Sequence, residues 1–527
     1  MPEAVVPDDA VAAPDLPRLD AKRTAVLLFS VMVVALCGIT YELIVATVSS
    51  YLLGNSVYQF SLTIGLFMFA MGVGSHLTRH VVSRLVQRFV AVEMAVALVG
   101  GLSSTVLFLV FPYYAFYRPV MYVLVIVVGI LVGLEIPLLT RILSASSGLR
   151  QAIANVLSLD YLGALIGAVG FPILLLPSLG LFRASFVIGL LNIAVATVTV
   201  FVFRRELQGL WRYVSGCAAV GLILGAAMLL SARITQFAEG QLFADQILYR
   251  EQTPYQRIIV TRNEGNNEIR LYLDGHIQFA SNDEYRYHEA LVHPIMSLPG
   301  RRAQVLILGG GDGLCARDVL RYPDVERIDL VDIDPAMTQL CRRFGPIVKM
   351  NGGSLDSPKV ELHHEDAFNY VLRSDRRYDR VIIDLPDPHN EVLSKLYSVE
   401  FYKGVRRILA EGGYLVTQSS SPFRTREAYW SVAETIRAAD AKVMGPMQTL
   451  SYNISLQSFG LWGFHLAARQ GPVPDQFAIE ESQVRFMNAE SLAAARIFSK
   501  DIAPLLGTVN SVFEPTLYLQ YQEGVLR

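Results

Sequence analysis

The chain has 527 residues, of which 52% are hydrophobic and 17% are charged. Ordinary soluble domains carry about 25% charged residues, so a large part of this protein avoids water. The formal net charge of -2 gives no sign of a nucleic-acid partner, which would need a basic surface. We expect no metal, because the cysteines and several histidines lack the spacing of a ligand set. These residues are Cys37, Cys217, Cys315 and Cys341, and His288, His293, His363 and His364.

Seven apolar runs follow an acidic, proline-containing tail, residues 1–23, that does not resemble a signal peptide. Each run is close to the roughly 20 residues that a helix needs to cross a bilayer core. Buried helices of a soluble domain would alternate with charged faces, and these runs do not. We therefore predict a transmembrane helical domain over residues 24–232, with about 7 spans near 24–46, 58–77, 90–112, 119–140, 154–176, 181–203 and 214–231.

Basic residues concentrate in the tail and in the second, fourth and sixth connections between the runs, as at Arg79 and Arg141. By the positive-inside rule the N-terminus is cytoplasmic, and seven spans would then place the rest of the chain outside the cell. Polar residues also interrupt the runs, among them Glu93, Glu135 and Asn192. They indicate either a functional cavity or hydrogen bonding between helices.

The pattern changes after residue 245 to short β-rich segments. RIIVTRN and IRLYLDG, separated by the turn-prone EGNNE, predict a hairpin within a small β domain over residues 245–300. From residue 301 to 470, strands alternate with amphipathic helices, which predicts an α/β domain with a doubly wound, parallel, Rossmann-like sheet. A C-terminal extension follows over residues 471–527.

Glycines and aspartates stand where the predicted parallel strands end, which is the edge at which such sheets bind ligands. A glycine loop with Gly309 and Gly311 follows the first strand. The next three strands end in acidic residues, which are Asp332, Asp366 and Asp384. A further aspartate, Asp387, follows shortly after the last of these strands. The structural alternative is that these aspartates are helix N-caps.

Asp312, within the loop GGGDG, indicates the charge of the ligand. A dinucleotide site binds pyrophosphate at an open helix N-terminus, and a carboxylate there would repel this anion. We therefore expect a cationic ligand. A nucleoside that carries an ammonium and a sulfonium group, with no carboxylate, fits this electrostatic requirement.

Several separated motifs then point to a family. They are TPYQ at 253–256, LDGHIQ at 273–278, DEYRYHEALVHP at 283–294, LGGGDG at 308–313, EDA at 365–367, DLPDP at 384–388 and TQSSSPF at 417–423. In this order they resemble the polyamine aminopropyltransferases, the spermidine synthase family, and the preceding spans resemble its bacterial membrane-fused subgroup. The resemblance implies a class I methyltransferase-type fold. It also implies transfer of the aminopropyl group of decarboxylated S-adenosylmethionine, a co-substrate, to putrescine or a related amine, giving spermidine and methylthioadenosine without a cofactor.

The resemblance also implies roles for individual residues, with Asp384 as the catalytic carboxylate. The donor-binding residues would be Gln256, Gln278, Gly309, Gly311, Asp312, Asp332, Asp366 and Ala367. The amine-binding residues would be Tyr287, His288, Asp384, Asp387 and Tyr452. The chain departs from the family at Asp332, where Glu is usual, and in DLPDP, which lacks the usual hydroxyl beside the acceptor. The preferred amine therefore stays open.

Two other functions stay open as well. One is an S-adenosylmethionine-dependent methyltransferase, which would not need the carboxylate cluster. The other is a membrane transporter or sensor whose soluble domain binds a polyamine or nucleoside without turnover. Because donor and putrescine are cytosolic metabolites, the synthase chemistry predicts a multi-pass protein of the cell membrane with a cytoplasmic catalytic domain. This conflicts with seven spans unless one run is re-entrant. The family commonly forms dimers, so a homodimer is also expected.

Overall fold

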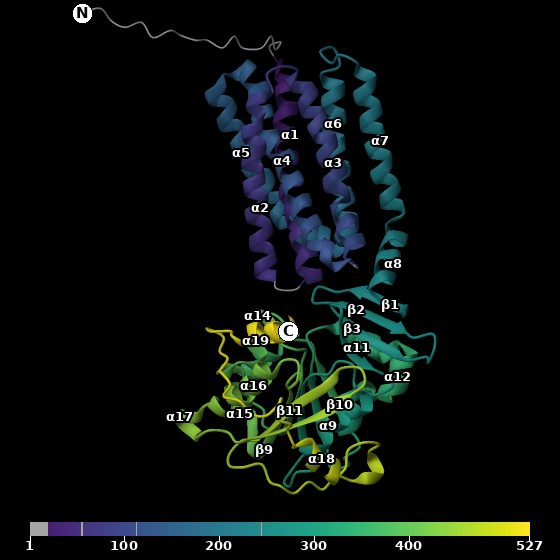
Figure 1. Cartoon of the computed structure of the whole chain (residues 1–527), viewed down its shortest axis with the longest axis vertical. Coiled ribbons are helices and arrows are strands. Elements are labelled where there is room, and N and C mark those ends of the chain that lie inside the picture. The colour runs from purple at the N-terminus through teal and green to yellow at the C-terminus, as the bar shows by residue number, and fades with distance from the viewer. Residues whose placement is uncertain (1–18, 54–55, 112, 244, 527) are drawn as a thin grey trace, which may run out of the picture. The chain divides into compact units, whose positions relative to one another are not determined.

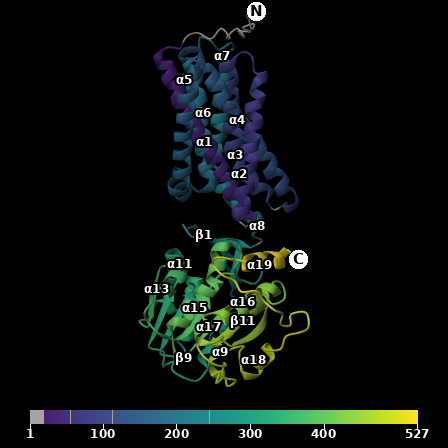
Figure 2. The same ribbon diagram turned by 90° about the vertical axis from the view of Figure 1, so that its left-hand side faces the viewer.

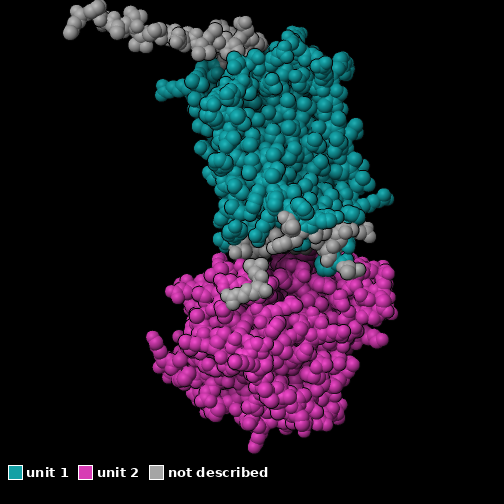
Figure 3. Space-filling view, in the orientation of Figure 1, with its two compact units in different colours: residues 1–243 teal, residues 244–527 magenta. Residues whose placement is uncertain are grey.

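The computed structural model describes residues 19–53, 56–111, 113–243 and 245–526. The chain divides into two compact units, residues 1–243 (unit 1) and residues 244–527 (unit 2), which Figure 3 shows in different colours. The predicted N-terminal tail lies outside the described residues up to residue 18. The predicted C-terminal extension belongs to unit 2, together with the sheets.

Unit 1 is a bundle of long helices that run alongside one another (Figures 1 and 2). A π-helical turn, η2 (Phe171–Leu175), joins the fifth helix to the sixth. The helices are α1 (Ala21–Leu53), α2 (Ser56–Leu77), α3 (Leu85–Val110), α4 (Tyr114–Ser147), α5 (Leu149–Gly170), α6 (Leu176–Val202), α7 (Leu210–Leu229) and α8 (Ser231–Leu242).

Among the described residues, six helical stretches are long and apolar enough to cross a membrane, against the seven runs predicted. The difference lies in residues 149–202, a stretch of 54 residues that contains both the fifth and the sixth run. A straight helix of this length would measure roughly 80 Å, far more than a hydrocarbon core of about 30 Å. Gly180 interrupts the helical path with φ 68° and ψ 178°, and both α5 and α6 pack against α1. The stretch therefore folds back on itself at Gly180.

Close backbone contacts and buried polar residues characterise the interior of this bundle. A Cβ added to Gly163 in α5 would lie 2.0 Å from the carbonyl oxygen of Met32 in α1, so this approach requires glycine. Glu93, Glu135 and Asn192 are all buried. Neither polar atom of the Asn192 amide has a hydrogen-bond partner among the described residues. Hydrogen bonding between helices therefore does not account for Asn192.

Two polar contacts locate the points at which the chain enters and leaves unit 1. The start of α1 lies beside the connection between α6 and α7, where Arg23 pairs with Glu206 at 2.7 Å. The chain leaves α7 beside the other end of α6, where Arg183 donates a hydrogen bond to Ser231 Oγ at 3.0 Å. Since α6 runs between these two contacts, the chain enters and leaves the bundle at opposite ends.

Unit 2 begins with a four-stranded antiparallel sheet in the order β1-β2-β3-β4. Its strands are β1 (Gln246–Gln252), β2 (Arg257–Arg262), β3 (Ile269–Leu273) and β4 (His276–Ala280). The second and third strands pair antiparallel, with Ile258 opposite Leu273. This pairing confirms the hairpin predicted from the sequence.

A larger, seven-stranded sheet follows in the order β10-β11-β9-β8-β5-β6-β7. The run from β9 to β7 is parallel, as predicted. The last two strands are antiparallel at one edge, which the sequence did not predict. They form a hairpin, because consecutive strands joined by a short turn can only pair antiparallel. The strands are β5 (Gln304–Gly309), β6 (Arg327–Val331), β7 (Val360–His363), β8 (Tyr378–Asp384), β9 (Leu409–Gln418), β10 (Thr449–Leu456) and β11 (Gly460–Ala468).

Helices bury both faces of this sheet. Val305 and Ile307 of β5 point into one hydrophobic core, and Leu306 and Leu308 point into another, because successive side chains of a strand face opposite sides. Strands buried on both faces read as continuous apolar runs. The helices are α9 (Glu284–Met296), α10 (Leu314–Val319), α11 (Pro335–Arg343), α12 (Gly345–Asn351), α13 (Ala367–Arg373), α14 (Glu391–Ser394), α15 (Val399–Ile408), α16 (Arg426–Ala438), α17 (Ala441–Met444), α18 (Ala489–Ala495) and α19 (Leu517–Leu526).

Candidate active site

The candidate site lies where the strand order reverses. From β5 the chain adds β6 and β7 on one side, while β8 and β9 lie on the other, so the ends of β5 and β8 meet at a switch point. Gly309 pairs with Asp384 there, and a Cβ on Gly309 would lie 2.0 Å from the Asp384 carbonyl oxygen. Gly309 also has φ 82°, which favours glycine. This approach of the two strand ends therefore depends on the glycine loop.

Gly309→Ala is expected to destabilise the protein, since the new methyl group meets a backbone oxygen that cannot move aside. Overpacking of this kind costs about 1–3 kcal/mol, and the positive φ adds about 1–3 kcal/mol. The measurement is the apparent unfolding temperature of the full chain in detergent. Gly345→Ala is the matched control, because a Cβ at Gly345 meets open space without a positive φ. Equal unfolding temperatures for the two variants would contradict the close approach.

A cavity of about 730 Å³ opens at this switch point, a size typical of small-molecule sites. The cavity brings together residues from the small sheet, from α9 and from the ends of the parallel strands. The predicted site residues in its lining are Gln256, Gln278, Tyr287, His288, Gly309, Gly311, Asp312, Asp332, Asp366, Ala367, Asp384 and Asp387.

Tyr452 is the predicted site residue that the structure keeps out of this lining. Its side chain is fully buried, and its hydroxyl donates a hydrogen bond to the carbonyl oxygen of Ala290 at 2.8 Å. Tyr452 shares a hydrophobic core with Ala290 and Leu291 of α9, so it faces the core beneath that helix. Its position therefore corrects the expectation that it contacts the amine.

The Asp332 carboxylate is held over the glycine loop by backbone groups. One of its oxygens accepts a hydrogen bond from the Gly311 amide at 3.0 Å, and the other accepts one from the Asp334 amide at 2.9 Å. The N-cap of α11 is Asp334, so Asp332 is free of that role. Asp366, by contrast, is a helix N-cap, the alternative role considered for these aspartates: it caps α13 by accepting a hydrogen bond from the Phe368 amide at 2.8 Å.

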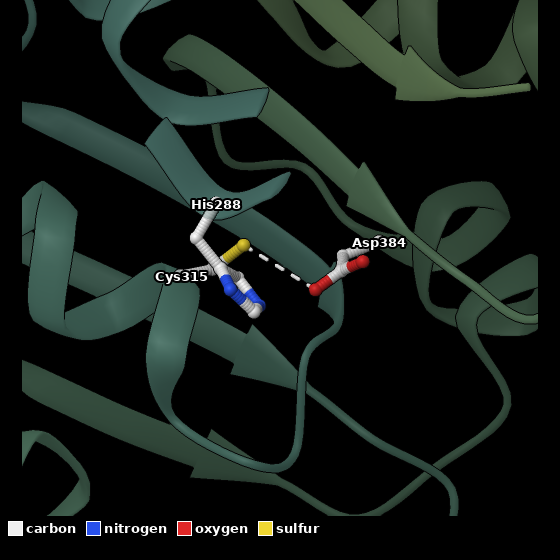
Figure 4. A group of neighbouring side chains, drawn as sticks. All are labelled: His288, Cys315 and Asp384. Atoms are coloured by element: carbon white, nitrogen blue, oxygen red, sulfur yellow. Dashed lines mark hydrogen bonds between the residues drawn. The ribbon is translucent and has the colours of Figure 1, made fainter. Parts of the chain in front are cut away.

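Asp384 is held by two side chains at the end of β8. The Tyr287 hydroxyl donates to its Oδ1 at 2.7 Å, and the Cys315 thiol donates to its Oδ2 at 3.3 Å. Figure 4 shows Cys315 and His288 facing this carboxylate. The carboxylate is therefore oriented before any ligand arrives.

Asp387 has two partners that sequence reasoning missed. Tyr521 in α19 donates to its Oδ2 at 3.0 Å, and Gln418 at the end of β9 donates to its Oδ1 at 3.3 Å. Tyr521 lines the cavity although it lies 134 residues beyond Asp387. No motif marks Tyr521, because it belongs to the C-terminal extension, beyond the last recognisable segment.

Burial weakens three of the acids that line the cavity. It raises the pKa of Asp312 to about 6, against the attraction of the positively charged His288. It also raises the pKa values of Asp332 and Asp387 to about 6, against the hydrogen bonds that each carboxylate accepts. Above about pH 6 these groups are therefore ionised, and a cavity lined by several such charges attracts cations.

His288 is a cationic side chain beside Asp312. Burial lowers its pKa, but hydrogen bonding to Glu284 and the charge of Asp312 outweigh burial and raise it to about 9. Glu284 in turn pairs with His288 and with Arg317, which hold its pKa down to about 2 although burial opposes this. Arg317 Nη1 lies 2.8 Å from Glu284 Oε1.

The fold and the cavity together define a Rossmann-like α/β enzyme whose cleft is lined by carboxylates. A family model described as "Spermine/spermidine synthase domain" matches residues 284–469. "Polyamine aminopropyltransferase 1" of Streptomyces coelicolor is 43% identical over 506 residues, which cover 94% of each chain. "Polyamine aminopropyltransferase" of Leptospira interrogans is 41% identical over 94% of this chain and 97% of its own. The protein belongs to the polyamine aminopropyltransferase family.

The alignments with these relatives are longer than unit 2, so they include helices of unit 1. Two solved structures were also found to be similar. The match to spermidine synthase from Thermotoga maritima covers 49% of this chain and 87% of the synthase chain at 25% identity, with a TM-score of 0.43. The match to a spermidine synthase in complex with the transition state analogue AdoDATO covers 49% of this chain and 88% of that synthase chain at 25% identity, with a TM-score of 0.44.

Proposed function

We propose that the protein transfers the aminopropyl group of decarboxylated S-adenosylmethionine to putrescine or a related diamine, giving spermidine and methylthioadenosine. The observation that carries this proposal is one cavity lined by both Asp312 and the oriented Asp384. Both substrates are cations. The two carboxylates can therefore collect them at neighbouring positions, and holding two reactants in line is the main requirement of a displacement at carbon.

The donor is proposed to lie along the glycine loop, with Gln256, Gln278, Asp366 and Ala367 around its nucleoside. Asp332 accepts hydrogen bonds from the ribose hydroxyls, and its fixed orientation over Gly311 supports this role. Asp312 pairs with the ammonium group of the donor. Ordinary S-adenosylmethionine would present a carboxylate to Asp312, so the same residue excludes it by repulsion.

The diamine is proposed to lie between Asp384 and Asp387, with Tyr287 and His288 beside it. One ammonium group loses its proton to Asp384, directly or through the Tyr287 hydroxyl. The free amine then attacks the propyl carbon bound to the sulfonium. The carbon–nitrogen bond forms as the carbon–sulfur bond breaks, and methylthioadenosine leaves as a neutral thioether. Asp387 holds the second ammonium group and sets the register of the acceptor.

Incubation of the full chain with decarboxylated donor and putrescine tests this reaction directly. Release of methylthioadenosine together with spermidine is the expected result. A methylated product from S-adenosylmethionine would instead identify a methyltransferase. Saturable binding of either substrate without any product would identify a transporter or sensor, and both of these outcomes would contradict the proposal.

Tyr521→Phe is expected to raise the KM for the diamine roughly 2–10-fold while kcat changes little, because one hydrogen bond contributes about 0.5–1.5 kcal/mol. The lost bond is the one that orients Asp387. Tyr518→Phe is the matched control, since Tyr518 lies in the same helix and bonds Glu391 outside the cavity. A KM for Tyr521→Phe equal to that of the control would remove Tyr521 from the acceptor site.

The kcat/KM for the diamine is expected to fall as the pH drops through about 6. Asp387 has a pKa raised to about 6, so it is ionised above this pH and loses its charge below it. Steady-state rates between about pH 8 and about pH 5 measure the effect, because kcat/KM reports ionisations of the free enzyme. Asp387→Asn should remove one ionisation from the profile, and a level profile in the wild type would speak against this account.

We also propose that unit 1 crosses the cell membrane and that the catalytic unit faces the cytoplasm, where donor and diamine are available. The arginine-rich connections predict a cytoplasmic N-terminus. Because the chain leaves the bundle at the end opposite its entry, they predict a catalytic unit outside the cell. The need for cytosolic substrates is the stronger argument, since turnover is impossible without them. A reporter fused at Arg527 that is active only outside the cell would overturn this placement. A homodimer, expected from the resemblance, is testable by the mass of the purified particle.

A further inference from the structure

Three side chains of different metal-binding chemistry meet at Asp384 (Figure 4). The imidazole of His288, the thiol of Cys315 and the carboxylate of Asp384 offer ligand atoms that all lie within 4.8 Å of one another. His288 and Cys315 are buried. They belong to α9 and α10, which pack against each other, and α9 also packs against the sheet. The three groups come from distant parts of the sequence, so no spacing motif announces them.

The spacing of these atoms is close to that of a tetrahedral ion. Metal bonds of about 2.0–2.3 Å place neighbouring ligand atoms about 3.3–3.8 Å apart. Cys315 Sγ already lies 3.3 Å from Asp384 Oδ2. Since no pair exceeds 4.8 Å, a shift of about 1 Å brings the imidazole to the same spacing.

His288 is oriented for this purpose by its other ring nitrogen. Nδ1 lies 2.7 Å from the carbonyl oxygen of Glu284. A carbonyl oxygen can only accept, so Nδ1 keeps its proton, and Nε2 is the nitrogen that can give up its own proton and bind an ion. Histidines that bind metals commonly donate their second N–H to such a partner.

The surroundings favour a divalent cation with an affinity for sulfur. Glu284 and Asp312 add negative charge around the group, as they do for the cationic substrates. A thiolate ligand selects Zn²⁺ or Cd²⁺ over Mg²⁺. On binding, the Cys315 thiol and the His288 imidazolium each release one proton to solvent as the sulfur–metal and nitrogen–metal bonds form, without a change of oxidation state.

We propose that His288, Cys315 and Asp384 form an inhibitory site for Zn²⁺ and similar thiophilic divalent cations. The bound ion occupies the Asp384 carboxylate, which then can neither attract the ammonium group of the acceptor nor take its proton. The inhibitory effect rests on the proposed function, whereas metal binding does not. The ion therefore competes with the diamine for one carboxylate.

The inhibition test uses the full chain with Zn²⁺ or Mg²⁺ at equal concentration. We expect Zn²⁺ to lower turnover at least tenfold and to be displaced by excess diamine, while Mg²⁺ has no effect. At the same Zn²⁺ concentration, Cys315→Ala should turn over at a rate within a factor of two of the rate that this variant shows without metal. Cys341→Ala, which removes another buried thiol of unit 2, should be inhibited like the wild type. Equal inhibition of both variants, or none in the wild type, would overturn the site.

Binding is measured separately from turnover with Co²⁺, whose thiolate complexes absorb through charge transfer. The wild type and Cys341→Ala should show this absorption, and Cys315→Ala should not. This readout needs no aminopropyl transfer, so a failure of the proposed function would leave it intact. Absorption in Cys315→Ala equal to that of the wild type would show that the ion binds elsewhere, whether or not the variant is active.

Discussion

Asp384→Asn is expected to lower turnover by about 10²–10⁴-fold, the usual contribution of a positioned general base. The amide keeps the shape of the carboxylate but cannot take a proton from the ammonium group of the acceptor. The Tyr287 hydroxyl can still donate to the remaining oxygen, so the site should stay assembled. Release of methylthioadenosine under saturating donor and diamine measures the effect as a loss of kcat.

The control for this experiment is Asp375→Asn, which removes an exposed carboxylate of unit 2 outside the cavity lining. It should turn over like the wild type. Donor binding by Asp384→Asn should also be preserved, because Asp312 and Asp332 are untouched. Full activity in Asp384→Asn would contradict the proposed mechanism, since Asp384 is the carboxylate that accepts hydrogen bonds from both Tyr287 and Cys315.

Asp312→Asn is expected to raise the KM for decarboxylated S-adenosylmethionine roughly 10–100-fold, because a hydrogen bond to a charged group contributes about 1.5–3 kcal/mol. The second expected effect is on selectivity. Without the carboxylate at position 312, the carboxylate of ordinary S-adenosylmethionine meets less repulsion, so this compound should become a better inhibitor. The asparagine oxygen can still accept from the Leu314 amide, as Asp312 Oδ1 does at 2.9 Å.

The measurement is the affinity for decarboxylated S-adenosylmethionine divided by the affinity for S-adenosylmethionine, from inhibition by S-adenosylmethionine at varied donor concentration. A lower value of this ratio in Asp312→Asn identifies the residue as the source of discrimination. The matched control is Asp356→Asn, which removes an exposed carboxylate paired with Arg342. If both variants keep the ratio of the wild type, another group must exclude the carboxylate of S-adenosylmethionine.

Most of the residues that line the cavity could be found from the sequence because their positions follow from local rules. A parallel strand buried on both faces is a short apolar run, and the residue after that run must lie at the edge of the sheet. This places Asp332, Asp366 and Asp384 at one edge before any packing is known. The glycine loop and Asp312 follow the same logic, since a loop that turns from strand to helix stays beside its strand.

The apolar runs were equally visible, because the length and composition of a membrane helix are local properties. Their arrangement was not. Residues 149–202 are one stretch by length and composition, and the non-helical backbone of Gly180 divides it. A count of crossings therefore depends on a single backbone conformation.

Contacts between distant segments were decided by the tertiary structure alone. Tyr521 reaches Asp387 from the end of the chain, Cys315 reaches Asp384 across the switch point, and Tyr452 turns into the core. Local sequence determined which residues stand at the ends of strands, because strand period and chain direction depend on neighbours in the sequence. Which of them meet depends on strand order and helix packing, and these follow from the free energy of the whole fold.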